Sequence, residues 1–350
     1  MENYAFDTNE ASKNKEHIVF MLDGSSYKPM YEYMLFDLVE NHDVSFVTDK
    51  KHNTYIKRNL LRRKVQRLTK GRLDLLGYEK NNLYKTLEYL CKRNERVIVV
   101  FFNSSLSYNS YLFGTLKRYK QMWSNLKYVL FYLDIVGVGV SINADYLREK
   151  QIFDLVYTVD KSDAEKYGMI HRKTFYSQSK RLLSKKPEND MYFCGVTKNR
   201  GKVIKKCALN ADDHLVDYTM DIVCYDEELN LSEAKGINIL DHSSYLSYQE
   251  VLERELNAKV LLEIVQQGQA ALTLRAYEAV AYNRKLLSNN KTMLSFGYYD
   301  PRFMRYFERV EDIDWDWVKE DVKVDYNYKG EFSPKLLLDD IIGRLNDGLF

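Results

Sequence analysis

The sequence predicts an α/β protein made of two doubly wound parallel sheets. Short apolar runs alternate with amphipathic helical segments, the runs are apolar on both faces, and the alternation pauses once near the middle of the chain. Strands that are apolar on both faces are typical of parallel sheets covered by helices on each side. A length of 350 residues suits two domains, and 15 glycines with 4 prolines are few for an all-β protein rich in tight turns.

The first domain is expected to span residues 1–160. Its strands are predicted at apolar runs such as HIVFML and RVIVVFF, and its helices where apolar residues recur three and four positions apart. The predicted strands are 17–22, 43–48, 96–102, 127–133 and 154–159, and the predicted helices cover 29–39, 83–90 and 108–123.

Residues 161–190 are expected to connect the two domains, because this segment is rich in Lys, Ser and Arg and shows no sustained periodicity. The second domain is expected to span residues 191–350. Its predicted strands are 191–196, 221–224, 237–240, 258–265 and 285–287, and its predicted helices are 200–209, 248–256, 273–282 and 333–345. Ligands of open α/β sheets bind at the carboxyl ends of the strands, so we expect the ligand in a cleft between the two domains.

Composition argues against several classes of protein. With 52 Lys and Arg against 50 Asp and Glu, no overall charge drives binding to nucleic acid. The four cysteines lack metal-ligand spacing, and free thiols fit a reducing cytoplasm. We expect no metal or cofactor, and the acidic run at 312–316 is interpreted as a turn or helix cap. No apolar run is long enough to span a bilayer, and residues 1–16 lack the apolar core of a signal peptide, so we expect a cytoplasmic location.

The most informative stretch, AKVLLEIVQQGQAALTLRAYEAVAYNRKLLSNN, covers residues 258–290. A buried strand runs into a polar loop, Gln267-Gly268-Gln269, and then into a helix beginning near Thr273, where free backbone N–H groups favour a phosphate. Arg275 lies in the first turn, where the helix dipole disfavours a cation unless an anion is also present. Glu278 lies on the same face and is placed to accept hydrogen bonds from ribose hydroxyls. The alternative is that Arg275 and Glu278 form a surface ion pair.

This stretch resembles the donor-binding segment of bacterial GT-B glycosyltransferases of capsule, exopolysaccharide and lipopolysaccharide assembly. Those proteins show a strand, a Gln-Gly-rich loop, a T-x-R-x-x-E-A helix and a strand similar to kKLITNN. The matching segments here are 267–269, 273–279 and 284–290, with further likeness at 153–164 and 193–200, over about residues 150–305. The resemblance implies a GT-B-like fold, two Rossmann-like domains facing across a cleft, with a nucleotide-sugar bound by the second domain.

One departure concerns stereochemistry. Retaining members of the wider class often carry two Glu eight positions apart, whereas the residue eight positions after Glu278 is Leu286. The sequence therefore leaves open whether the anomeric configuration is retained or inverted.

Further candidate site residues lie at or just after the ends of predicted strands. Gly195 would let a ligand approach the backbone closely, and it is followed by Lys198, Arg200 and Lys202. These three cations neutralise a diphosphate in one interpretation and form a solvated helix face in the other. Asp23 and Asp134 follow first-domain strands and are the candidates for the base that faces an acceptor hydroxyl, or else are turn or cap residues.

A basic segment covers residues 50–72 and contains no Asp or Glu. Its apolar residues recur at helical spacing, and its cations include Arg58, Arg62, Arg63 and Arg67. Such a helix would lie on anionic lipid at about 1 kcal/mol per basic residue, which suits peripheral contact with the inner face of a membrane. The alternatives are contact with nucleic acid phosphates or a solvated helix face.

Together these features predict a metal-independent hexosyltransferase of surface polysaccharide biosynthesis. It would move a sugar from a nucleotide-sugar donor to a carbohydrate acceptor, with a lipid-linked acceptor as one form. The leading alternative is a non-catalytic GT-B-like binding or scaffold protein of a polysaccharide assembly complex. A nucleic-acid-binding protein and a sugar-nucleotide epimerase are weaker alternatives.

Overall fold

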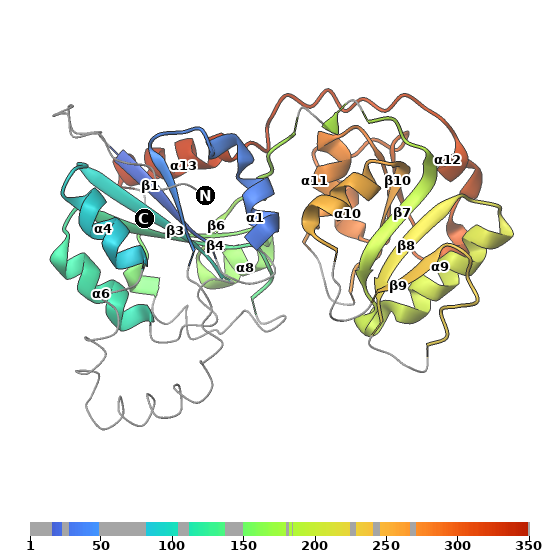
Figure 1. Ribbon diagram of the computed structural model, residues 1–350, viewed down its shortest axis with the longest axis horizontal. Coiled ribbons are helices and arrows are strands. Elements are labelled where there is room, and N and C mark those ends of the chain that lie inside the picture. Colours follow the sequence, from blue (N-terminus) through green and yellow to red (C-terminus); the bar gives the residue numbers. More distant parts are fainter. Residues whose placement is uncertain are drawn as a thin grey trace, which may run out of the picture. The chain divides into compact units, whose positions relative to one another are not determined.

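The computed structural model describes most of the chain, and the structural statements below concern these residues. The described ranges are 16–22, 28–48, 82–103, 112–136, 150–179, 182–183, 185–224, 229–240, 246–266 and 271–348. The contacts divide the chain into two compact units. The first comprises residues 1–28, 39–171 and 343–350, and the second comprises residues 29–38 and 172–342. Each unit contains one parallel six-stranded sheet (Figure 1).

The sheet of the first unit has the strand order β2-β1-β3-β4-β5-β6. Its strands are β1 (Glu16–Leu22), β2 (Val44–Thr48), β3 (Arg96–Phe102), β4 (Leu126–Tyr132), β5 (Leu155–Thr158) and β6 (Ile170–His171). Its helices include α4 (Asn82–Cys91), α6 (Leu112–Met122), the short η3 (Lys150–Ile152) and α8 (Lys161–Tyr167). Six consecutive residues are buried in each of β1 and β3, as expected for central strands of a parallel sheet covered on both faces.

The sheet of the second unit has the strand order β12-β11-β10-β7-β8-β9. Its strands are β7 (Asn189–Val196), β8 (Tyr218–Val223), β9 (Ile237–Leu240), β10 (Ala258–Glu263), β11 (Lys285–Ser288) and β12 (Met304–Tyr306). Its α-helices are α9 (Gly201–Asp213), α10 (Tyr248–Glu255), α11 (Leu274–Ala281) and α12 (Trp315–Lys319), together with most of α1 (Lys28–Met34) and of α13 (Pro334–Asp347). Its short helical turns are η1 (Phe36–Leu38), η5 (Lys198–Arg200), η6 (Lys291–Ser295) and η7 (Val310–Asp312).

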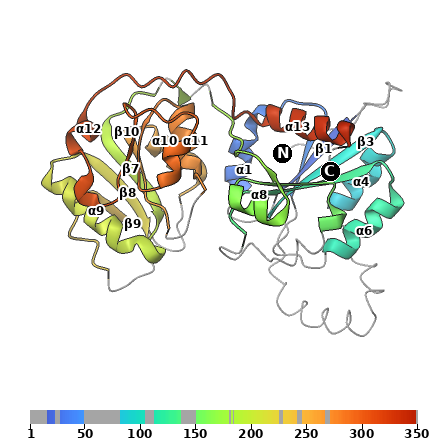
Figure 2. The same cartoon turned by 180° about the vertical axis from the view of Figure 1, so that it is seen from behind.

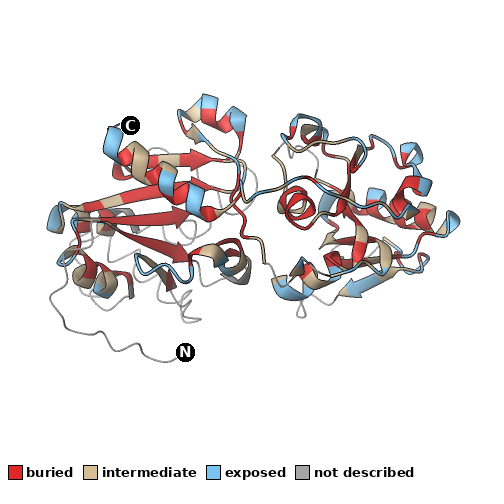
Figure 3. Ribbon diagram, turned by 90° about the horizontal axis from the view of Figure 1, so that it is seen from above, coloured by how far each residue is buried: buried red, intermediate tan, exposed pale blue. Residues whose placement is uncertain are grey.

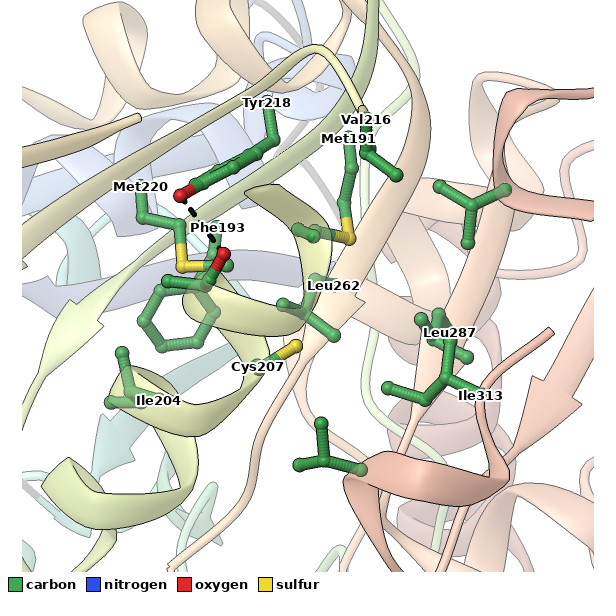
Figure 4. Close-up of a cluster of buried hydrophobic side chains, with 14 of the residues drawn as sticks. Met191, Phe193, Ile204, Cys207, Val216, Tyr218, Met220, Leu262, Leu287 and Ile313 are labelled. Atoms are coloured by element: carbon green, nitrogen blue, oxygen red, sulfur yellow. Dashed lines mark hydrogen bonds between the residues drawn. The ribbon is translucent and has the colours of Figure 1, made fainter. Parts of the chain in front are cut away.

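Helices cover both faces of the second sheet. Helices α9 and α12 lie on one face and α10 and α11 on the other (Figures 1 and 2). Figure 4 shows part of the core on the α9 side, where Phe193 and Leu262 of the strands meet Ile204 and Cys207 of α9. Figure 3 shows the buried residues concentrated in the strands, with exposed residues gathered on helices and loops.

The predicted doubly wound α/β architecture is confirmed. Each strand expected from an apolar run is present, and the two that the sequence analysis missed, β6 and β12, have only two and three residues. Helix α8 was also missed, since it lies in the segment 161–190 that was expected to be a connection. Its caps are recognisable in the sequence, because Asp160 accepts a hydrogen bond from the backbone N–H of Asp163 and Gly168 ends the helix at a φ of 63°.

Candidate nucleotide site

The predicted site lies at the carboxyl edge of the second sheet. Strands β11, β10 and β7 are adjacent and parallel, so the loops that follow Val196, Glu263 and Ser288 leave the sheet at the same edge. This is the edge where open α/β sheets bind ligands. The predicted loop, Gln267-Gly268-Gln269, lies outside the described residues.

Gly195 makes room for an arginine side chain. A Cβ atom at this position would lie 2.6 Å from Nη2 of Arg200 and 3.0 Å from the ring of Phe193. The side chain of Arg200 crosses the end of β7, where its Nε donates to the carbonyl oxygen of Val196 at 3.0 Å and its Nη1 donates to that of Ile264. Because Gly195 has no side chain, it leaves space for a guanidinium that bridges the ends of β7 and β10. The sequence analysis expected the glycine to leave space for a ligand instead.

No carboxylate forms an ion pair with Arg200 within the part of the chain that the structure describes, although the charge of Glu263 acts on it from a greater distance. Its guanidinium lies 5.5 Å from the centroid of the Phe193 ring, and that of Arg275 lies 5.8 Å from the same ring. Burial, and after it the positive charge of Arg275, lowers the pKa of Arg200 to about 10, while the charge of Glu263 opposes this shift. Because a desolvated cation without a direct ion-pair partner is unfavourable, an anion bound here would be stabilised.

The start of helix α9 adds to this positive site. Its N-cap is Arg200, which makes no side-chain cap hydrogen bond, and its first turn contains no acidic residue. The neighbouring Lys198 is exposed and has a φ of 40°, a conformation that costs energy in a residue other than glycine. Uncapped N–H groups, the helix dipole and two cations therefore coincide at the end of β7.

Arg275 is paired with a residue that the sequence analysis did not identify. Its Nε and Nη2 donate to Oε1 of Glu255 at 2.9 and 2.6 Å, and its Nη1 donates to the carbonyl oxygen of Leu262 at 3.1 Å. The side chains of Arg275 and Glu255 are 14% and 1% exposed. The alternative of a surface pair between Arg275 and Glu278 is therefore wrong. Glu255 is the last residue of α10, and no motif in the sequence marks it as a partner.

Glu278 is buried in the second unit, with 3% of its surface exposed. It accepts a hydrogen bond from the hydroxyl of Tyr248, which lies 3.0 Å from that of Tyr176. Burial and then the charge of Glu255 hold the pKa of Glu278 well above its usual value. Oε2 of Glu255 is buried and has no other hydrogen-bond donor among the described residues, so a protonated Glu278 would satisfy it.

Thr273 begins helix α11 and links two neighbouring strands. Its Oγ1 accepts a hydrogen bond from the backbone N–H of Arg275 at 3.2 Å and donates to Glu263, the last residue of β10. Ser288, the last residue of β11, donates to the other oxygen of Glu263. The side chain of Asn290 donates to the carbonyl oxygen of Ala271 at 3.0 Å. The start of helix α11 and the Ser288-Asn289-Asn290 segment are thus joined by hydrogen bonds to the buried carboxylate of Glu263.

Apart from the exposed Lys202 of α9, the remaining predicted residues belong to the first unit or lie outside the described residues. Asp134 belongs to the first unit, follows β4 and is exposed. Asp23 and the four arginines of the basic segment, Arg58, Arg62, Arg63 and Arg67, lie outside the described residues.

The described residues contain neither a metal-ligand cluster nor a membrane-spanning helix. Within these ranges, no group of three or more His, Cys, Asp or Glu side chains is arranged to hold a metal ion. None of the helices in the same ranges combines the length and apolar character needed to cross a bilayer. In the acidic run at 312–316, Asp314 accepts a hydrogen bond from the backbone N–H of Trp317 at 3.0 Å and caps α12, which confirms its interpretation as a helix cap.

The chain matches no protein-family model and no curated protein by sequence. It is similar to a solved α-glucosyltransferase in complex with UDP-glucose and DNA containing an abasic site, with a TM-score of 0.56, 11% identity and coverage of 95% of this chain and 100% of that one. A glycosyltransferase from Rickettsia africae ESF-5 gives a TM-score of 0.50, 11% identity and coverage of 94% and 97%. At these identities the likeness shows the fold. The chain has a GT-B fold of two Rossmann-like units, as the sequence predicts.

Proposed function

We propose that this protein is a glycosyltransferase whose second unit binds a nucleotide-sugar donor at the carboxyl edge of β7 and β10. The observation that carries the proposal is Arg200, a partly buried guanidinium that has no carboxylate partner among the described residues and lies close to Arg275. A diphosphate supplies the missing negative charge, and it matches both a guanidinium and a helix N-terminus in hydrogen-bonding geometry. The similar α-glucosyltransferase was solved with UDP-glucose, which supports this class of ligand.

In the proposed reaction, the acceptor hydroxyl oxygen bonds to the anomeric carbon of the donor sugar while the bond from that carbon to the diphosphate oxygen breaks. Negative charge then accumulates on the departing diphosphate. Arg200 and the start of α9 are held in place before the reaction, and we propose that they and Lys198 neutralise the leaving group without a metal ion. The hydroxyl proton passes to a carboxylate of the first unit, for which Asp134 and Asp23 remain the candidates.

We also assign Glu278 to the ribose of the donor. Its carboxyl group already accepts a hydrogen bond from a hydroxyl group, that of Tyr248. Ribose hydroxyls would take the place of this tyrosine hydroxyl when the donor binds. Since the proton of Glu278 is directed to Glu255, the other oxygen of Glu278 would accept hydrogen bonds from the ribose hydroxyls.

The acceptor is proposed to be a carbohydrate of a surface polysaccharide, lipid-linked if the basic segment 50–72 contacts anionic lipid. The support for this finer assignment is the resemblance of residues 150–305 to enzymes of capsule and lipopolysaccharide assembly, together with the lack of acidic residues in the basic segment.

A thermal-shift screen with UDP, GDP, dTDP and CMP tests donor binding, because a ligand that binds only the folded state raises the melting temperature. We expect one of the nucleotides to stabilise the second unit. The matching sugar nucleotide is then incubated with saccharide acceptors, and transfer is followed by mass spectrometry. Stabilisation by none of the four nucleotides would contradict the proposal. Binding without transfer to any acceptor would favour the non-catalytic alternative.

A further inference from the structure

The second unit contains another hollow, here called the ring-lined cavity, with a volume of 840 Å³. It is lined by residues of three segments, 172–175, 297–302 and 325–332. The third segment is tied to the amino ends of two strands, since the hydroxyl of Tyr326 donates to the carbonyl oxygens of Arg284 and Phe303, the residues just before β11 and β12. The candidate nucleotide site lies at the carboxyl ends of the parallel strands, so the cavity is a separate site at the opposite edge of the sheet.

Aromatic rings form much of the wall of the ring-lined cavity. Phe332 and Tyr326 are buried, whereas Tyr298 and Tyr299 are half-buried and so retain accessible surface. The ring of Tyr298 meets that of Phe332 edge to face, with centroids 5.3 Å apart. Tyr299 has no ring partner and no side-chain hydrogen bond among the described residues. The wall therefore combines a ring held rigidly by its neighbours with a tyrosine available to a ligand.

The charges that line the cavity cancel. Three are positive and three negative: Arg172, Lys173, Arg302, Asp300, Asp325 and Glu331. Arg302 holds Asp300 in a forked pair, with Nε to Oδ1 at 3.0 Å and Nη2 to Oδ2 at 2.5 Å. Glu331 accepts the hydrogen bond of the Tyr298 hydroxyl and that of the Lys329 backbone N–H, the latter at 2.8 Å. Three of these six groups are thus held in place by these contacts, and the site has no excess charge of either sign.

We propose that the ring-lined cavity binds a neutral pyranose oligosaccharide. A pyranose ring has an apolar C–H face that packs on an aromatic ring, and its hydroxyls both donate and accept hydrogen bonds, which matches a wall of tyrosines, carboxylates and cations. The volume lies within the range of roughly 300–1,000 Å³ for pockets that bind small molecules. A phosphorylated ligand or nucleic acid would need a surplus of positive charge that this wall lacks. The site would hold a glycan while the opposite edge of the sheet binds the nucleotide.

Saturation-transfer NMR with maltotriose, cellotriose and triacetylchitotriose tests the proposal, with inorganic phosphate as the anionic competitor. We expect at least one trisaccharide to bind in the millimolar range and Tyr299→Ala to weaken it at least about tenfold. The matched control is Tyr306→Ala, because Tyr306 is also half-buried, likewise lacks side-chain partners among the described residues, and does not line the cavity. The near-ultraviolet circular dichroism of each variant shows whether it is folded.

Three results would overturn the proposal: no binding of any trisaccharide, equal binding by wild type and folded Tyr299→Ala, or displacement of the trisaccharide by phosphate. Arg200→Met separates this site from the proposed donor site. We expect it to bind the trisaccharide as the wild type does, whether or not the protein binds nucleotides.

Discussion

Removing the carboxylate of Glu255 is expected to destabilise the second unit strongly. The side chain is 1% exposed, and one of its oxygens accepts two hydrogen bonds from Arg275. In Glu255→Ala the guanidinium donates hydrogen bonds only to the backbone carbonyl oxygens of Leu262 and Cys194, since Glu278 acts on it electrostatically but is not hydrogen-bonded to it. Removing one partner of a buried ion pair costs about 3–5 kcal/mol, because the other charge is left buried and uncompensated. Glu255→Gln keeps the shape and an acceptor oxygen, so we expect a smaller loss of about 1.5–3 kcal/mol.

The free energy of unfolding is measured by urea titration. Trp315 and Trp317 report on the second unit, because both are buried in its core. Glu311→Ala is the matched control, since Glu311 forms an exposed ion pair with Lys206, and such pairs contribute little. A loss below about 1 kcal/mol in Glu255→Ala, no larger than that of the control, would refute the conclusion that Glu255 balances the charge of Arg275.

Three further predictions follow from the same contacts. Because the fold raises the pKa of Glu278, its contribution to the free energy of unfolding is complete below its usual pKa of 4.5 and is lost as pH rises toward the raised pKa. Urea titrations at several pH values should show a smaller decline of this free energy with pH in Glu278→Gln than in wild type. An equal decline in the two proteins would contradict the raised pKa. Gly195→Ala should displace the guanidinium of Arg200 and so weaken nucleotide binding in calorimetry, while the melting temperature changes little. Nucleotide affinity equal to that of wild type would show that binding does not depend on this position of the guanidinium. Burial lowers the pKa of Lys285 from 10.5 to about 8, so the unfolded state binds more protons than the folded state between these pH values. The stability of wild type relative to Lys285→Met should therefore increase as pH rises from about 8 to 10.5. A stability difference that stays constant over this range would contradict the lowered pKa.

The sequence predicted the fold well because the signals were local. Apolar runs such as 96–102 identify strands that are buried on both faces, and they matched β3 and its neighbours closely. The elements that were missed are β6, β12, α8 and α12. The shortest of these contain two to five residues, which is too few for a periodic pattern to show.

The candidate site was predicted only in part. Strand ends and the helix start placed Arg200 and Arg275 in the same region, because chain order and parallel topology determine which loops meet. The sequence could not show that Glu255 binds Arg275 or that Tyr248 binds Glu278. These contacts join α10 to α11 through tertiary packing, and no fixed spacing along the chain encodes them. For the same reason the sequence could not show that Gly195 leaves space for the side chain of Arg200.

Calorimetric titration of Arg200→Met with a nucleoside diphosphate tests the central claim most directly. The nucleotide is the one that stabilises wild type best, and the matching nucleoside without phosphates is titrated alongside it. Arg309→Met is the control, since the side chain of Arg309 is 73% exposed and pairs with Asp312. Loss of a charge-assisted hydrogen bond of about 1.5–3 kcal/mol predicts about ten- to hundredfold weaker diphosphate binding by Arg200→Met and unchanged nucleoside binding. Equal diphosphate affinity in wild type, Arg309→Met and Arg200→Met would contradict the account.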